Sequence, residues 1–172
     1  MRKNILLVGF MGVGKGALAR ELARCDEALF ALDTDDMIES MTNTRIKKIF
    51  ERAGEEAFRA LEQKCADWLA KNVTNAVIST GGGFYKVKNL NDIGTVVYLK
   101  ADFSWILNRI MSAPNAKKKL KKRPLFQDIE KAKRLFDERY EAYEKVADII
   151  IDVSGKDTES IAKEILKEAR QQ

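Results

Sequence analysis

The 172-residue sequence contains no histidine, and this absence removes several kinds of chemistry from consideration. A Ser-His-Asp triad, a histidine general base, a histidine metal site and a histidine pH switch are all excluded. Cysteine is scarce as well: Cys25 and Cys65 are too few for a four-thiolate zinc site or a disulfide framework. We expect both to be unpaired thiols in a reducing compartment.

Long apolar segments are also missing. No stretch approaches the roughly 20 apolar residues that a membrane-spanning helix needs, and the run at residues 5–8 is too short for a signal peptide. These features favour a cytoplasmic protein without membrane contact. The length, with 45% hydrophobic and 33% charged residues, indicates one globular domain over residues 1–172.

Short apolar runs alternate with longer segments of helical periodicity. The predicted strands are 4–9, 29–33, 76–80, 95–99 and 149–153. The predicted helices are 15–24, 55–70, 102 or 104 to 111, 128–145 and 157–169. Continuous apolar runs are typical of strands that are buried on both faces of a parallel sheet. The pattern therefore predicts an α/β fold, an open sheet with helices on both faces.

The clearest motif follows the first predicted strand. Residues 9–16 read Gly-Phe-Met-Gly-Val-Gly-Lys-Gly and match G-x-x-x-x-G-K, a loop that cradles phosphate between a strand and a helix. Backbone N–H groups converge on phosphate oxygens there, and Lys15 reaches the outer phosphates. A plain glycine-rich turn is the alternative. The motif predicts a nucleotide site that contains Gly12, Val13, Gly14, Lys15, Gly16 and Ala17.

One position departs from this motif. The residue after the lysine should be Ser or Thr, whose hydroxyl ligates Mg²⁺, whereas Gly16 and Ala17 carry no hydroxyl. A water could fill the place, because Mg²⁺ readily keeps several waters. We therefore expect weaker metal binding.

Acidic residues and glycines end the second and third predicted strands. Because positions i and i+2 of a strand point the same way, we expect Asp33 and Asp35 to project together at the sheet edge. One carboxylate could hold the water shell of a metal and the other could accept a proton from a substrate hydroxyl; helix caps are the alternative. Gly81, Gly82 and Gly83 leave room for a substrate to approach backbone N–H groups, or form a flexible turn.

Four arginines stand apart from these motifs. Arg109, Arg123 and Arg139 are typical of solvated surface charges, whereas Arg59 interrupts an apolar patch, and a guanidinium suits a planar carboxylate. The segment at about 112–126 holds both prolines and a basic run. A long loop inside a compact domain is more often functional than idle.

Together these motifs resemble the shikimate kinases, small P-loop kinases of aromatic amino-acid biosynthesis. The resemblance covers essentially the whole chain. Its motifs are residues 9–15, 32–35, 49–50, 58–59, 81–83, 123–125 and Arg139 before Tyr143. It implies a P-loop sandwich with a five-stranded parallel sheet, a mobile lid at about 112–126, and Mg²⁺-assisted transfer of the ATP γ-phosphoryl group to the 3-hydroxyl of shikimate.

The resemblance also implies the substrate residues. Asp35, Arg59, Gly81–Gly83 and Arg139 fall where the family binds shikimate. The two arginines would grip its carboxylate, while Asp35 would bond its ring hydroxyls and serve as the candidate base.

The nucleotide side follows in the same way. Lys15 matches the phosphate lysine of the family, and Asp33 matches the acid that holds the waters of Mg²⁺. Arg123 matches a lid arginine that closes over the transferring phosphoryl group, and Arg109 matches an arginine near the adenine. Lys15, Asp35 and Arg123 would thus be the catalytic residues, and the resemblance implies a monomer.

Other functions stay open on the residues alone. The chain could be a related kinase for gluconate or a nucleoside monophosphate, or a nucleotide-binding domain that Gly16 has weakened. The six basic residues of 117–123 exceed the net charge of +5 and could bind nucleic acid. They lack interleaved aromatic residues for stacking on bases, and a lid over ATP explains them equally well, so we expect no nucleic-acid partner.

Overall fold

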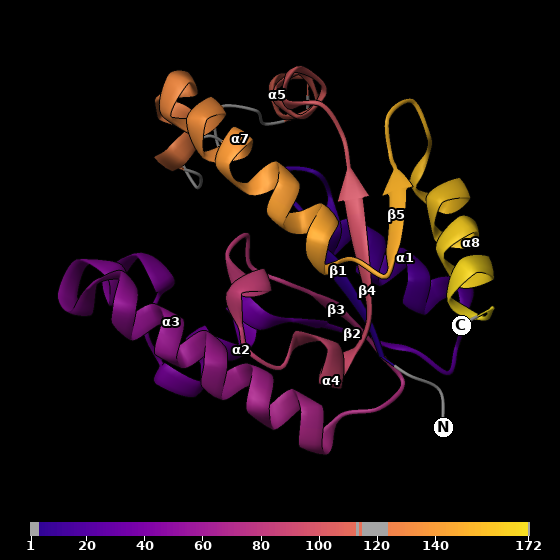
Figure 1. Cartoon of the computed structure of the whole chain (residues 1–172), viewed down its shortest axis with the longest axis horizontal. Helices are drawn as coiled ribbons and strands as arrows, with labels where there is room; N and C mark the ends of the chain where they lie inside the picture. Colours follow the sequence, from indigo (N-terminus) through magenta and orange to yellow (C-terminus); the bar gives the residue numbers. More distant parts are fainter. Residues whose placement is uncertain (1–3, 113, 115–123, 172) are drawn as a thin grey trace.

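The computed structural model describes residues 4–112, 114 and 124–171, and five of its segments form one parallel sheet (Figure 1). The strands are β1 (Asn4–Val8), β2 (Phe30–Asp33), β3 (Ala76–Ser79), β4 (Gly94–Lys100) and β5 (Ile149–Asp152). They lie in the order β2-β3-β1-β4-β5, and every pair is parallel. The predicted α/β fold with a five-stranded parallel sheet is confirmed.

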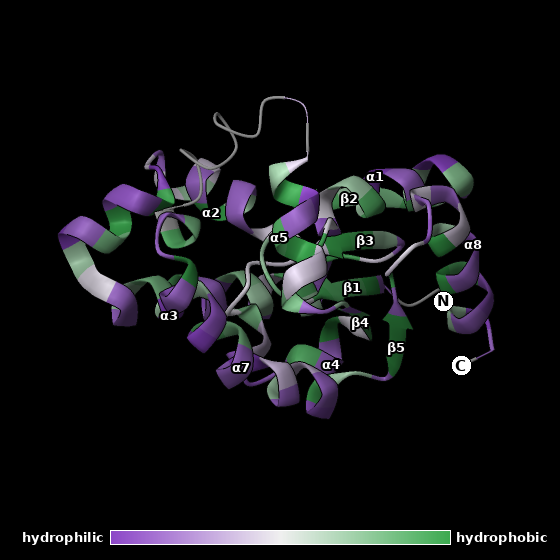
Figure 2. Cartoon of the chain, turned by 90° about the horizontal axis from the view of Figure 1, so that it is seen from above, coloured by the Kyte–Doolittle hydropathy of each residue, from purple (hydrophilic) through white to green (hydrophobic). Residues whose placement is uncertain are grey.

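Burial explains the arrangement of the strands. All residues of β1 and β3 are buried, and in Figure 2 these strands are among the most hydrophobic parts of the chain. The two edge strands are more exposed: Phe30 in β2 is 72% exposed and Ile150 in β5 is 47% exposed. Strands that are covered on both faces need continuous apolar runs, which is the pattern of the central strands.

The helices cover both faces of the sheet. They are α1 (Lys15–Cys25), α2 (Thr34–Thr42), α3 (Ile46–Asn72), α4 (Leu90–Ile93), α5 (Phe103–Met111), α7 (Ile129–Val146) and α8 (Thr158–Ala169), with the 3₁₀ turns η1 (Phe84–Lys86) and η2 (Pro124–Gln127). Helices α1 and α8 pack on each other at one face, and α3, α4 and α7 lie on the other side (Figure 1). No helix in the described part of the chain is long and apolar enough to cross a membrane.

Helix α2 and the first part of α3 have no counterpart in the sequence prediction. Strand β2 ends at Asp33, whose carboxylate caps α2 by accepting the backbone N–H groups of Asp35 and Asp36. The alternative that Asp33 caps a helix is confirmed. The i and i+2 strand argument for Asp33 and Asp35 is wrong, because Asp35 lies in the first turn of α2. Gly54 interrupts α3 with φ 79°, and the predicted helix 55–70 is the second part.

An aromatic cluster fixes the first βα turn in the core. Phe10 is only 2% exposed and packs edge-on against Phe103 of α5, Phe126 of η2 and Phe136 of α7, at ring-centroid distances of 5.3 to 6.3 Å. Buried aromatic pairs of this geometry add stability beyond the area they bury. The loop after β1 is thus held by α5, η2 and α7, which lie more than 90 residues later in the chain.

Candidate active site

The glycine-rich loop joins β1 to α1 in a conformation that other residues rarely adopt. Gly12 has φ 90° and Gly14 has φ 112°, both in the left-handed region. A Cβ on Gly14 would also lie 2.9 Å from an Arg109 guanidinium nitrogen. Arg109 itself donates to the carbonyl of Val13 at 3.0 Å and lies over the Trp105 ring. The loop therefore needs glycine here for both its backbone and its neighbour.

Lys15 lies inside this loop. Its side chain is buried, and its ammonium donates to the carbonyl oxygens of Gly9 at 2.7 Å and Phe10 at 3.2 Å. The positive charge thus stands where the N-terminus of α1 begins. A lysine at a helix N-terminus, beside the backbone N–H groups of a glycine loop, is an arrangement that binds anions.

Gly16 lies beside two side-chain oxygen atoms and one arginine nitrogen. A Cβ on this residue would be 3.7 Å from Ser79 Oγ, 3.8 Å from Arg20 Nη1 and 3.9 Å from Asp33 Oδ2. Hydroxyl and carboxylate oxygens suit Mg²⁺ with part of its water shell. Across residues 4–112, 114 and 124–171, no group of three or more acidic or cysteine side chains is placed to hold a metal. The residues present fit a metal that is held largely through water and phosphate.

Two carboxylates meet beside the glycine turn that follows β3. Asp35 Oδ1 and Glu62 Oε1 are buried, and neither has a hydrogen-bond partner among the described residues. A Cβ on Gly81 would lie 2.7 Å from the first oxygen and 3.3 Å from the second. Burial, with the charges of Asp33 and Glu62, raises the pKa of Asp35 to about 6. Burial also raises the pKa of Glu62, against the lowering effect of Arg59.

The arginines complete the site. The Arg59 guanidinium donates to buried Glu62 at 2.5 Å, and a Cβ on Gly83 would collide with it. Arg139 donates to the carbonyl of Gly82 at 3.0 Å, and the Tyr143 hydroxyl donates to the same oxygen at 2.6 Å.

A cavity of about 500 Å³ opens beside the two guanidinium groups. It is lined by Phe50, Glu55, Arg59, Tyr85, Lys86, Leu135, Glu138 and Arg139. The cavity therefore brings together the two arginines that the family resemblance assigns to the substrate carboxylate.

Each glycine of the turn therefore lies against a predicted substrate residue: Gly81 against Asp35, Gly82 against Arg139 and Gly83 against Arg59. The expectation that backbone N–H groups here are open to a substrate needs correction at one residue. The N–H of Gly81 donates to the buried Thr34 hydroxyl at 3.0 Å. The absence of side chains in this turn makes room for charged groups.

Other residues of the site escaped the sequence prediction. Glu62 and Ser79 carry no motif that separates them from ordinary helix or strand residues, and Tyr143 entered the sequence analysis only as a residue that follows Arg139 in a family motif, without a role of its own. A weak signal exists for Glu62, which lies one helical turn after Arg59. Arg123 and most of the predicted lid, residues 113 and 115–123, lie outside the described residues.

An open parallel sheet whose first strand leads into a helix through a G-x-x-x-x-G-K loop, with the lysine buried inside that loop, defines a P-loop nucleotide-binding protein. A family model described as "Shikimate kinase" matches residues 11–170. The chain is 41% identical over 165 residues to a shikimate kinase of Helicobacter hepaticus, covering 96% of this chain and 95% of that one. A shikimate kinase of Caldanaerobacter subterraneus is 39% identical over 171 residues, with 96% and 95% covered.

Solved structures give the same result. A shikimate kinase from Acinetobacter baumannii in complex with shikimate superposes with a TM-score of 0.83 and 31% identity, covering 98% of this chain and 93% of that one. The chain belongs to the shikimate kinase family. The resemblance stated from the motifs is confirmed.

Proposed function

We propose that this protein phosphorylates the 3-hydroxyl of shikimate with ATP. The observation that carries the proposal is the turn at 81–83, which packs one carboxylate and two guanidinium groups against its three glycines. Shikimate presents a matching set, one carboxylate and several ring hydroxyls. The shikimate-bound relative from Acinetobacter baumannii supports the same substrate.

Each substrate residue has a chemical task in this proposal. Arg59 and Arg139 hold the carboxylate, because guanidinium groups bind planar anions through paired N–H donors. Asp35 accepts a hydrogen bond from the ring hydroxyl and takes its proton as the phosphoryl group transfers. The pKa of Asp35, about 6, lies closer to pH 7 than that of an ordinary carboxyl, and a general base works best when its pKa is near the operating pH. At pH 7 the Asp35 carboxyl is still mostly ionised.

The nucleotide residues orient and neutralise the phosphates. Lys15 and the loop N–H groups bind phosphate oxygens, and Arg109 borders the nucleotide through its contact with Val13. We assign Arg123 to the transferring phosphoryl group on the family resemblance. Phosphoryl transfer needs mainly positioning and charge neutralisation, and these residues supply both.

Mg²⁺ is part of the proposal. Asp33 and Ser79 would hold it through water at the space beside Gly16. When bound, it would neutralise charge on the phosphates of ATP.

We also propose that the enzyme acts as a monomer in the cytoplasm. The family resemblance supports the first point. Cys25 and Cys65 are free thiols, which supports a reducing compartment.

ADP release from ATP tests the proposed reaction, with shikimate, gluconate and nucleoside monophosphates offered separately across a Mg²⁺ titration. We expect ADP release that depends on shikimate alone. Release with gluconate or a nucleotide instead would assign the chain to a related kinase, and no acceptor-dependent release would leave a nucleotide-binding domain.

A further inference from the structure

The Arg59 guanidinium already holds a carboxylate of its own chain at the edge of the cavity. Its Nε and Nη2 atoms donate to one oxygen of Glu55, at 3.1 and 2.9 Å. A guanidinium binds a planar carboxylate through one of its two-nitrogen edges. Glu55 therefore occupies an edge that an incoming carboxylate could use.

The two glutamates that contact Arg59 differ in how firmly they are held. The side chain of Glu62 is 2% exposed, whereas that of Glu55 is 61% exposed and lines the cavity. Exposed ion pairs contribute little stability, while a buried charge that loses its partner is costly. Glu62 is thus a permanent partner of Arg59, and Glu55 is an exchangeable one.

The path for the exchange is short. Glu55 and Arg59 are four residues apart in the part of α3 that follows the break at Gly54. Rotation of the exposed Glu55 side chain towards solvent frees the Nε and Nη2 donors without movement of the backbone. The contact between Arg59 and Glu62 then still fixes the guanidinium beside Gly83.

We propose that Glu55 is a built-in competitor for the substrate carboxylate. In the free enzyme it occupies the Arg59 edge that the substrate takes over, and it thereby limits affinity for carboxylate-bearing ligands. This inference rests on the proposed function, in which Arg59 binds the carboxylate of shikimate.

Calorimetric binding of shikimate to Glu55→Gln tests the proposal. From the strength of exposed ion pairs we expect binding about two- to fivefold tighter than wild type. Shikimate methyl ester, which carries no carboxylate charge, should gain nothing from the substitution. Weaker or unchanged shikimate binding by Glu55→Gln would overturn the proposal, and weaker binding would make Glu55 a residue that positions Arg59.

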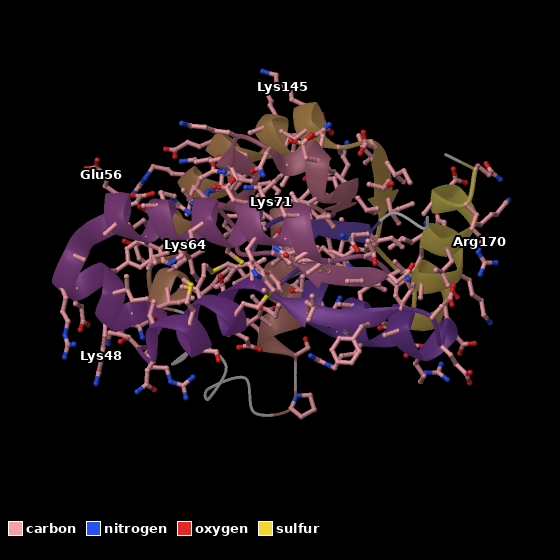
Figure 3. All side chains as sticks on the ribbon, turned by 90° about the horizontal axis from the view of Figure 1, so that it is seen from below. Lys48, Glu56, Lys64, Lys71, Lys145 and Arg170 are labelled. Carbon is pink, nitrogen blue, oxygen red and sulfur yellow. The ribbon has the colours of Figure 1, made fainter. Side chains whose placement is uncertain are left out.

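Two control variants distinguish loss of the contact between Glu55 and Arg59 from loss of a negative charge near the cavity. Glu56→Gln removes a charge from the adjacent residue, which projects outward from α3 (Figure 3), and should leave shikimate binding unchanged. Glu138→Gln removes a charge from the cavity wall. A gain in Glu138→Gln equal to that in Glu55→Gln would refute a specific exchange at Arg59.

A third variant distinguishes this inference from the proposed function. Arg59→Met should weaken shikimate binding at least tenfold. If it does so while Glu55→Gln has no effect, the competitor role fails and the substrate assignment stands. If Arg59→Met leaves shikimate binding unchanged, the carboxylate site itself is wrong.

Discussion

Replacing Gly16 with serine should strengthen the use of Mg²⁺, and the structure shows that the side chain fits. A Cβ at this position meets Ser79 Oγ, Arg20 Nη1 and Asp33 Oδ2 at 3.7 to 3.9 Å, which is ordinary van der Waals contact. The backbone of Gly16 does not require glycine, since its φ lies outside the left-handed region. The added hydroxyl would enter the space that we assign to the metal and its waters.

The substitution should change both the stability of the helix and the Mg²⁺ dependence of activity, and an alanine variant separates the two effects. Gly16 lies in the first turn of α1. In helix interiors serine is favoured over glycine by about 0.5 kcal/mol and alanine by about 1 kcal/mol, which sets the upper bound for this position. For a chain of this length, 1 kcal/mol shifts Tm by about 2–4 °C. Gly16→Ala should therefore gain at least as much stability as Gly16→Ser. Only the serine should lower the Mg²⁺ concentration that gives half-maximal activity, by about tenfold.

The assay combines turnover with equilibrium binding. ADP release is measured across a Mg²⁺ titration at saturating shikimate for wild type, Gly16→Ser and Gly16→Ala. Calorimetry with a non-hydrolysable ATP analogue, with and without Mg²⁺, reports the metal effect without turnover. If the serine and alanine variants need the same Mg²⁺ concentration, the hydroxyl at position 16 does not reach the metal and the reasoning is refuted.

Three further substitutions probe the remainder of the site. Asp35→Asn should lower kcat at least about 100-fold. It should also raise the free energy of unfolding above pH 6 by up to about 3 kcal/mol, because burial of the ionised carboxylate destabilises the fold there. This gain should largely vanish below pH 3.8, where the carboxyl is mostly protonated in both the folded and the unfolded state. Urea titrations at pH 8 and pH 3.5 check this, and an equal gain at both would contradict it. The kcat/KM of wild type should fall as the pH drops through about 6, and a flat profile down to pH 5 would exclude Asp35 as the base. Gly83→Ala should displace Arg59 and raise the KM for shikimate about tenfold with the KM for ATP unchanged; an unchanged shikimate KM would show that the guanidinium has no role there. Arg109→Met should raise the KM for ATP and leave the KM for shikimate unchanged. Steady-state kinetics with each substrate varied in turn checks this, and a raised KM for shikimate instead would contradict it.

Much of the fold follows from short-range patterns. The apolar runs of β1 and β4 are continuous because helices cover both faces, and such runs are readable without a structure. The start of α2 cannot be predicted from the sequence in this way. Asp33 both ends a strand and caps a helix, and a run of acids after a strand fits an extended edge as well as a first helical turn. Local propensity cannot decide between the two.

The conformation of the loop at 9–16 was predictable, since the spacing of its glycines encodes the backbone shape. The substrate side depends on which charged residues become buried, and this is a property of partners far apart in the sequence. Glu62 has the composition of a solvated helix residue, yet it is 1% exposed because Arg59 neutralises it. The glycine turn at 81–83 leaves room for both.

Charged groups from distant parts of the sequence also explain why three glycines are adjacent at 81–83. Each leaves space for a polar group from another element: Asp35 from α2, Arg139 from α7 and Arg59 from α3. A side chain at any of the three would meet a charged group within about 3.1 Å. Read alone, the motif fits a flexible turn equally well. Its role depends on α2 and α3, which follow β2, and on α7, which follows β4, because these helices place their charged groups beside the turn that follows β3. The topology of the sheet therefore explains the three glycines, and the local sequence does not.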